Sequence, residues 1–251
     1  MAVSRSELEV YLNTLLRPER FEDYCPNGLQ VEGSDQIEKL VSGVTACQAL
    51  IDAAVDVNAN AILVHHGYFW RGENAALVGM KGRRIRTLIR NDMNLFAYHL
   101  PLDNHLELGN NAGLGRTLGV ESWAPAGGEH SVEPLFTGAL RAPLPLATLA
   151  QNLEVALGRP VISVGQGDVQ QLAWCTGGGQ NYIERAADLG VDAFITGEIS
   201  EQTVHSARER GIAFIAAGHH ATERFGVQSV GQHIATRFHL QYQFIDIDSP
   251  A

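Results

Sequence analysis

The sequence contains few of the residues on which several protein classes depend. Its 251 residues include only 3 cysteines and 3 methionines, so an adaptable methionine-rich groove for lipids or peptides is not expected. Cys25, Cys47 and Cys175 are odd in number and widely spaced, and no CxxC pair occurs. This pattern excludes a disulfide framework and a thiolate zinc site, and it indicates reduced thiols in the cytoplasm.

Positive charge is also scarce. Lys and Arg number 18 against 28 Asp and Glu, for a formal net charge of -10, and the one short basic stretch, residues 81–86, has helical spacing. Direct nucleic-acid binding is not supported, because phosphate contacts require clustered positive charge. No stretch is apolar enough to span a membrane, and the first residues contain no signal core, so we expect a cytoplasmic protein with no membrane association.

The chain does contain a regular alternation of apolar strands and amphipathic helices. Strands without polar alternation are typical of α/β proteins in which helices cover both faces of the sheet, so we predict largely parallel sheets. A capping box at residues 6–9 predicts the start of the first helix, which ends near Pro18, and residues 25–33 have turn chemistry. The expected strands are residues 39–46, 59–66, 93–100, 135–140, 160–165, 172–177, 191–198, 212–219 and 240–248. The later expected helices are residues 47–58, 83–92, 110–119, 144–158, 180–190, 200–211 and 223–238.

The pattern also contains an internal repeat. A shift of 132 residues aligns two helix–strand units, and a shift of 120 residues aligns His99 with His219 and Asp103 with Glu223. Any two β-α-β units can align in part by chance, but the matched His-x-x-x-carboxylate ends favour a duplication. We therefore predict two α/β halves related by a pseudo-dyad, residues 1–125 and 126–251, with the second intertwined with the first.

Three of the predicted strands end in residues that can bind metal ions. In open parallel sheets, ligands bind beyond the carboxyl ends of the strands. Imidazole and carboxylate together suit Zn, Mn, Fe, Co or Ni, and five strong ligands suit two ions roughly 3.5–4 Å apart, bridged by a carboxylate and a water. The predicted ligands of two divalent ions per chain are His65, His66, Asp103, His219 and Glu223, with Glu223 or Asp103 bridging.

Each of these residues also has a structural explanation. His65 and His66 can end a strand and bond to backbone, Asp103 can cap a following helix, and Glu223 suits the first turn of a helix. Taken singly, these explanations are the commoner ones. Their joint occurrence at three strand ends favours the metal site.

Other motifs carry weaker signals. Residues 176–180 (TGGGQ) resemble a phosphate-binding turn but lack the Walker A and dinucleotide spacings, and a tight turn explains them equally well. Asn27, in another turn, could line a pocket. No G-x-S-x-G nucleophile motif occurs, so any chemistry is expected to be metal-assisted.

Several long motifs together resemble the Nif-three-like family, whose members are also called GTP cyclohydrolase I type 2 homologues. The resemblance runs from about residue 23 to residue 248 and is closest to the compact bacterial members. The motifs are PNGLQVEG, VTACQAL, ILVHHGYFW, HLPLDNHLELGNN, AWCTGGGQ, DAFITGEISEQTVHSARERG and AAGHHATERFG.

The resemblance implies a duplicated α/β protein that assembles as a toroidal homohexamer, a trimer of dimers. It implies a dinuclear metal site facing a central cavity that could hold a small-molecule substrate. The family's ligands fall on His65, His66, Asp103, His219 and Glu223, each of which matches in residue type and spacing.

Two functions follow from this pattern. The first is a metal-dependent hydrolase that acts through a metal-bridging water on a nucleotide or phosphoester-like substrate. The second is a non-enzymatic metal-binding, scaffolding or regulatory ring protein. For the enzyme, the candidate catalytic residues are His99, Glu198 and His220, chosen by position.

Overall fold

The computed structural model describes residues 2–128 and 130–251, which form two compact units. Unit 1 comprises Met1–Leu102 and Gly226–Asp248, and unit 2 comprises Asp103–Phe225 and Ser249–Ala251. These boundaries differ from the predicted halves, residues 1–125 and 126–251. The reason is that the C-terminal strand β13 (Gln241–Phe244) pairs with β4 (Lys39–Thr45) and so belongs to unit 1. Within the described ranges, no helix is long and apolar enough to cross a membrane.

Unit 1 contains a five-stranded sheet in the order β13-β4-β5-β6-β2. The first four strands run parallel, as predicted, and β2 pairs antiparallel with β6 at the edge. Strand β2 lies within residues 25–33, for which we predicted only a turn. A strand of four residues is too short to show a periodic pattern of apolar side chains. The further strands of this unit are β1 (Val3–Ser4), β2 (Gly28–Val31), β3 (Gln36–Ile37), β5 (Ala61–His66) and β6 (Asn94–Ala97).

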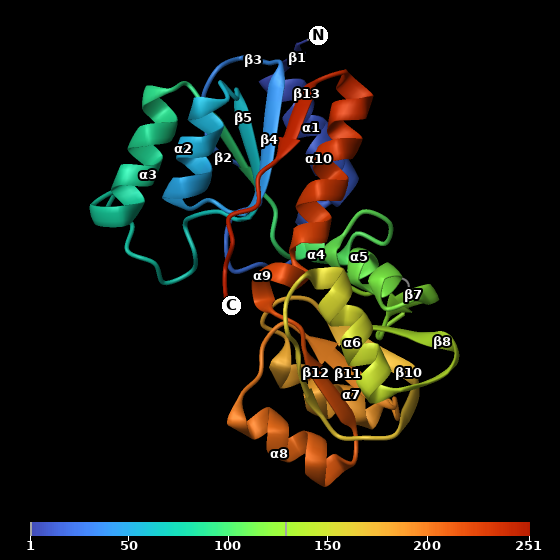
Figure 1. Ribbon diagram of the computed structural model, residues 1–251. Coiled ribbons are helices and arrows are strands. Elements are labelled where there is room, and N and C mark those ends of the chain that lie inside the picture. The colour runs from blue at the N-terminus through green and yellow to red at the C-terminus, as the bar shows by residue number, and fades with distance from the viewer. Residues whose placement is uncertain (1, 129) are drawn as a thin grey trace. The chain divides into compact units, whose positions relative to one another are not determined.

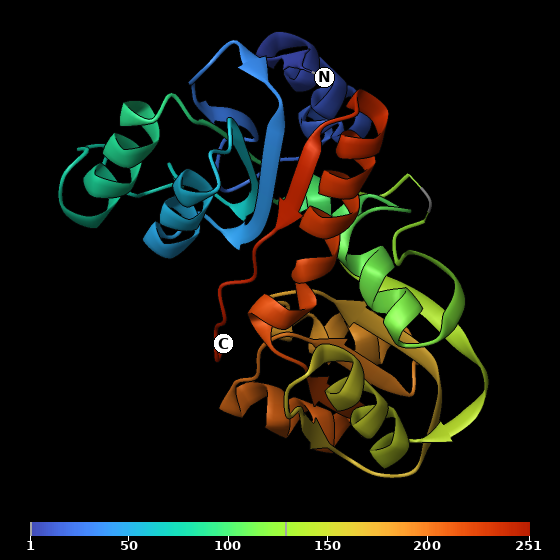
Figure 2. The same cartoon turned by 45° about the horizontal axis from the view of Figure 1, so that its top comes forward.

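Helices cover both faces of this sheet. Figure 1 shows α2 and α3 on one side and α1 and α10 on the other, and the turned view in Figure 2 agrees. On the first side, Leu50, Ile51 and Ala54 of α2 pack in one apolar cluster with strand residues such as Ile62 and Val64. The helical segments of this unit are α1 (Arg5–Leu16), η1 (Pro18–Arg20), α2 (Gln48–Asp56), α3 (Gly79–Arg90) and, from Gly226 on, α10 (Arg224–Phe238). The chain passes from unit 1 to unit 2 within α4 (Leu100–Asn104).

The first helix begins earlier than the capping box at residues 6–9 predicts. Ser4 is the N-cap of α1, and its hydroxyl accepts a hydrogen bond from the backbone N–H of Glu7 at 3.2 Å. The sequence is ambiguous because Ser4 and Ser6 each stand three residues before a glutamate. The antiparallel pairing of Ser4 with Gln36 fixes the extended conformation that an N-cap requires.

Unit 2 contains a six-stranded sheet in the order β7-β8-β10-β11-β12-β9. Its central strands β10, β11 and β12 run parallel, whereas β7, β8 and β9 pair antiparallel. The prediction of largely parallel sheets is therefore right for unit 1 and wrong for this one, because the chain returns directly from β7 to β8 without a crossover helix. The strands are β7 (Val120–Pro125), β8 (Phe136–Pro145), β9 (Ile162–Val164), β10 (Asp168–Cys175), β11 (Ala193–Thr196) and β12 (Ala213–Ala216).

Two apolar clusters flank this sheet. Alternating residues of the same strand divide between them, since Trp174 of β10 lies in the cluster with α5 and α6 and Ala173 lies in the cluster with α7 and α8. A sheet buried on both faces explains why its strands read as continuous apolar runs. The helical segments are α5 (Asn110–Thr117), α6 (Leu146–Leu157), η2 (Gln180–Tyr182), α7 (Ile183–Asp188), α8 (Glu201–Arg210) and α9 (His219–Thr222).

The turns after β10, β11 and β12 pack tightly against one another. The N–H of Gly197 donates to the carbonyl of Gly177 at 2.9 Å, and the N–H of Gly218 donates to the carbonyl of Gly197 at 2.9 Å. A Cβ on Gly197 would lie 2.6 Å from the Gly177 carbonyl oxygen and 2.7 Å from the Cα of His219. Glycine at position 197 therefore allows the backbone approach that positions His219.

We expect Gly197→Ala to lower the free energy of unfolding by about 1–3 kcal/mol, because the added methyl group meets backbone atoms that cannot rotate away. Urea unfolding followed by circular dichroism measures this loss. The exposed Gln202→Ala in α8 is the matched control and should change stability by less than about 0.5 kcal/mol. Equal stability of the two variants would contradict the packing argument.

Candidate metal centre

In unit 1, three histidines follow the carboxyl ends of two neighbouring parallel strands. His65 and His66 end β5, and His99 follows β6 by two residues. Val64 and Ala97 are paired across these strands, so the three histidines come one or two residues after this pair. One ligand atom from each histidine lies within 4.8 Å of the other two.

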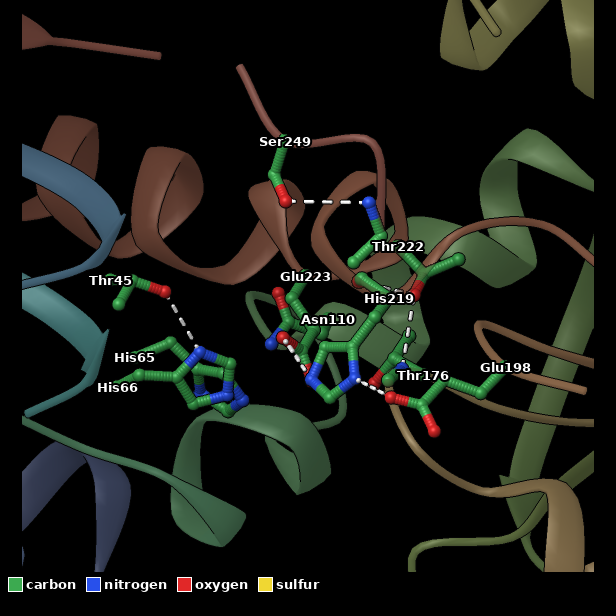
Figure 3. A network of polar contacts seen from close by, with 12 residues as sticks. Thr45, His65, His66, Asn110, Thr176, Glu198, His219, Thr222, Glu223 and Ser249 are labelled. Carbon is green, nitrogen blue, oxygen red and sulfur yellow. Dashed lines mark hydrogen bonds and ion pairs between the residues drawn. The ribbon is translucent and has the colours of Figure 1, made fainter. Parts of the chain in front are cut away.

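The ring nitrogens of the adjacent pair have defined partners. His65 is fully buried, and its Nδ1 lies 3.1 Å from the backbone carbonyl of Tyr98. A carbonyl only accepts, so Nδ1 carries the proton and the ring's lone pair is on Nε2. His66 Nδ1 lies 3.0 Å from the hydroxyl of Thr45 at the end of β4, as Figure 3 shows.

His99 is oriented by a carboxylate. Its Nδ1 lies 2.7 Å from Oδ1 of Asp23, whose side chain is 2% exposed. Asp23 also accepts hydrogen bonds from the side chain of Asn27 and the backbone N–H groups of Tyr24 and Leu100. Burial alone would raise the pKa of Asp23, but the hydrogen bond from His99, the other donors and the charge of the imidazole lower it overall. The carboxylate therefore stays ionised and holds the Nδ1 proton of His99.

In unit 2, one histidine lies between two glutamates. His219 begins α9, its Nδ1 lies 2.7 Å from Oε1 of Glu198, and its Nε2 lies 3.1 Å from Oε2 of Glu223 (Figure 3). Glu223 is buried directly after α9, whereas Glu198 follows β11 and its Oε2 accepts from the Gln180 amide at 3.2 Å. The spacing of four residues brings His219 and Glu223 together, as the sequence predicts.

The two glutamates change the protonation of His219. Burial alone lowers its pKa, but hydrogen bonds and charge interactions with Glu223 and Glu198 outweigh burial and raise the pKa to about 9. Without a metal ion, the ring is therefore a protonated imidazolium near neutral pH. A divalent cation at Nε2 would replace this proton and satisfy the same carboxylate of Glu223.

The carboxylate of Asp103 accepts hydrogen bonds from uncharged groups. It lies in α4, it is buried, and its Oδ1 accepts from the amide of Asn110 at 2.8 Å and the hydroxyl of Thr176 at 3.1 Å. Both of these donors are uncharged, so they orient the carboxylate without neutralising its charge. Burial, followed by the charges of Asp103 and Glu223, raises the pKa of the Cys175 thiol, which keeps that cysteine protonated.

The sequence-predicted residues thus form two groups, each described within its own unit. Unit 1 brings together His65, His66 and His99. Unit 2 brings together His219, Glu223 and Glu198, and carboxylate oxygens of Asp103 and Glu223 lie within 4.8 Å of each other. Glu198, which was chosen only by position, has a direct contact with a predicted ligand. His220 follows in α9, and its backbone N–H donates to the carbonyl of Ala251 at 3.3 Å.

Sequence reasoning missed the residues that orient these side chains. They are Asp23, Thr45, Asn110 and Thr176, and Asn27 is likewise an orienting residue. A hydrogen-bond partner far away in the sequence leaves no local signal; Asp23, for example, is 76 residues from His99. The TGGGQ stretch is a tight turn, because a Cβ on Gly179 would lie 2.6 Å from Sγ of Cys175 and 2.8 Å from Oγ1 of Thr196.

Comparison with known proteins agrees with the resemblance found in the sequence. A "GTP cyclohydrolase 1 type 2 homolog" of Pseudomonas aeruginosa is 53% identical over 252 residues, which cover 100% of both chains. The solved structure of "protein ybgI, unknown function" is 49% identical, with a TM-score of 0.94 over 99% of this chain and 100% of that one. The solved structure of TTHA1606 from Thermus thermophilus is 34% identical, with a TM-score of 0.90 over 99% of this chain and 100% of that one.

The family profile described as Duf34/NIF3 (NGG1p interacting factor 3) matches residues 3–250, which is nearly the whole chain. Together with relatives that are more than half identical over nearly their full length, this match determines the family. The chain belongs to the Duf34/NIF3 family.

Proposed function

We propose that this protein binds two divalent metal ions and uses them to hydrolyse a nucleotide or phosphoester-like substrate. The ligands are His65, His66, Asp103, His219 and Glu223. The observation that carries the proposal is the hydrogen bonding at Nδ1: His65 donates to a backbone carbonyl and His219 to the Glu198 carboxylate. Metal-binding histidines are typically held by such partners, which fix the tautomer and direct Nε2 to the ion.

The donor atoms fit the ions that we predict. Three imidazole nitrogens and two carboxylates suit Zn, Mn, Fe, Co or Ni, and no thiolate is in the set. His65, Asp103 and Glu223 are buried, and buried carboxylates need a cation or strong donors to remain ionised. Two ions would offset the charge of both carboxylates.

Chain connectivity supports the joint action of the two groups. His99, which contacts the histidine pair, lies four residues before Asp103, and α4 spans the interval. His219 and Glu223 repeat this spacing in unit 2. We propose that the same two ions are bound by all five ligands named above, with Glu223 or Asp103 bridging.

When bound, two such ions would lower the pKa of a water between them and supply hydroxide near neutral pH. The chain's own residues have supporting roles. Glu198 holds the proton at Nδ1 of His219, Asp23 holds the proton at Nδ1 of His99, and Asn110 and Thr176 orient Asp103. His99, Glu198 and His220 remain the candidates for proton transfer to and from a substrate.

We also propose that the protein is cytoplasmic and acts as a toroidal homohexamer. The proposal rests on the family and on the sequence arguments given above. Size-exclusion chromatography with light scattering tests the assembly, and a monomer at micromolar concentration would contradict it.

We expect gently purified protein to contain about two divalent ions per chain. His65→Ala and Glu223→Ala should each bind fewer ions because each removes a ligand, while His205→Ala should bind as many as the parent. His205 is a fair control because its side chain is 60% exposed on α8. Elemental analysis measures the ions and circular dichroism checks the fold. Metal-free parent protein that takes up no ion after incubation with Zn, Mn, Fe, Co or Ni would refute the metal site.

The hydrolase part is tested separately with the intact metal-loaded protein. Nucleotides and phosphoesters are supplied as substrates, and we expect turnover that chelation abolishes and that the His65→Ala variant lacks. Full metal occupancy without any turnover would replace the hydrolase by the non-enzymatic metal-binding function.

In metal-free protein, we expect the His219 ring to titrate with a pKa of about 9 and Glu198→Gln to move this pKa down toward the ordinary value of 6.5. The pKa is raised by folding, so the charge interaction stabilises the fold fully below about pH 6.5 and is lost as the pH rises through 9. The parent should therefore lose stability over this interval relative to Glu198→Gln. NMR titration of the ring and urea unfolding at several pH values measure both effects.

Glu201→Gln is the matched control, because Glu201 is 94% exposed and lies 3.9 Å from His205 on the surface. It should leave the titration of His219 unchanged. A His219 pKa near 6.5 in the metal-free parent would contradict the electrostatic argument.

A further inference from the structure

Two aromatic side chains adjoin the histidines of unit 1, and the proposed hydrolysis uses neither of them. The ring of Trp70 meets His99 edge-on, with centroids 5.0 Å apart, and its centroid lies 6.0 Å from that of His66, a proposed ligand. The ring of Tyr24 approaches His99 edge-on as well, with centroids 6.2 Å apart. A molecule held at these histidines would therefore lie beside both aromatic rings.

Neither ring is buried as a core residue would be. Tyr24 is 57% exposed, and Trp70 is half-buried. The indole N–H of Trp70 donates to the carbonyl of Gly67 at 3.3 Å, which fixes the plane of the ring. One partly exposed aromatic side chain is ordinary, but two of them beside one group of polar residues are typical of a small-molecule site.

The two loops that carry these rings are bonded to each other. The backbone N–H of Arg71 donates to the carbonyl of Tyr24 at 2.7 Å, and its guanidinium donates to the carbonyl of Asp23 at 3.1 Å. The guanidinium carbon also lies 5.9 Å from the centroid of the Tyr24 ring, which is a cation–π distance. Rings that are already held in place lose little conformational entropy when a ligand stacks on them.

The backbone just before Trp70 is strained. Phe69 has a φ of 66°, in the left-handed region that bulky residues rarely adopt. One carboxylate oxygen of Glu73 fixes this turn, because it accepts from the N–H of Phe69 at 2.9 Å and from that of Trp70 at 3.2 Å. The two neighbouring rings separate as a result: Phe69 lies 5.8 Å from the ammonium of Lys81, whereas Trp70 meets His99. Backbone strain of this kind is concentrated at sites that hold a ligand.

We propose that Tyr24 and Trp70 form a subsite that binds the planar ring of a nucleobase. Aromatic side chains stack on any base, because every base has a π face. The inference deepens the proposed function and rests on it, since it selects a nucleotide over a phosphoester that has no base. The metal ligands would hold the reacting group, and the two rings would hold the other end of the same molecule.

The other role open to these rings is to cover the histidines. Leucine separates the two roles, because its side chain is also large and apolar but has no π face. If the rings only cover the histidines, Trp70→Leu and Tyr24→Leu will not change the preference for a base. If the rings stack on a base, both substitutions will reduce this preference.

The experiment uses the full, metal-loaded chain and the phosphonate analogues of AMP and of ribose 5-phosphate, whose P–C bond is not hydrolysed. Isothermal titration calorimetry measures both affinities. We expect the parent to bind the AMP analogue about tenfold more tightly, because only this probe has a ring to stack. Trp70→Leu and Tyr24→Leu should each weaken the AMP analogue by about fivefold or more and leave the ribose analogue unchanged.

Trp70→Phe and Tyr24→Phe are the matched controls, because each keeps an aromatic ring, and each should retain most of the preference. Elemental analysis checks that every variant keeps its ions, and circular dichroism checks the fold. Tryptophan fluorescence locates the base. The chain has 3 tryptophans, of which Trp174 is fully buried, so quenching by the bound base should disappear in Trp70→Phe.

The inference is overturned if the parent binds both analogues equally, or if both leucine variants keep the full preference. With ions still bound, either result leaves the proposed hydrolase standing. A parent that takes up no ions defeats the proposed function, and adenosine, which has no phosphate, then tests the subsite through the quenching of Trp70. If a leucine variant does not fold, quenching decides in its place: quenching that persists in Trp70→Phe refutes the subsite, and its loss supports it.

Discussion

Parallel strands carry their carboxyl ends to the same edge of a sheet, and the candidate metal centre depends on this constraint in both units. In unit 1, β5 and β6 are paired neighbours, so His65 and His66 emerge beside His99. In unit 2, β11 and β12 are paired neighbours, and Glu198 and His219 follow them. Residues that are far apart in sequence thus meet because backbone pairing leaves their strands no other register.

A second constraint acts on the side chains. A buried polar atom needs a hydrogen-bond partner. An imidazole nitrogen that is buried or half-buried and that would not bind a metal ion therefore needs such a partner. The carbonyl of Tyr98, the carboxylate of Asp23 and the carboxylate of Glu198 fill this role for His65, His99 and His219. The same contacts that stabilise the folded chain therefore also determine which nitrogen each ring presents. The stability of the fold and the proposed binding of metal ions therefore depend on the same residues.

Much of the fold could be predicted from periodicity. Long apolar runs such as residues 59–66 and amphipathic stretches such as residues 144–158 gave the right kind of element, because burial of one face or both leaves a pattern. Short elements such as β2 were not predicted, since four residues are too few for a periodic pattern. The antiparallel strands of unit 2 were not predicted either. An antiparallel return needs only a turn, and no local sequence pattern indicates which edge of the sheet the next strand joins.

The sequence by itself determined the family, the mixed α/β class and the polar residues that end the strands, because each of these is written in local order and spacing. It also brought His219 and Glu223 together, since four residues make about one helical turn. Only the tertiary structure decided that β13 belongs to unit 1 and that His99 joins the histidine pair. It alone decided that Asp23 holds His99 from 76 residues away. Such contacts are chosen by packing and by the need to satisfy buried polar atoms, and neither of these has a signature in neighbouring residues.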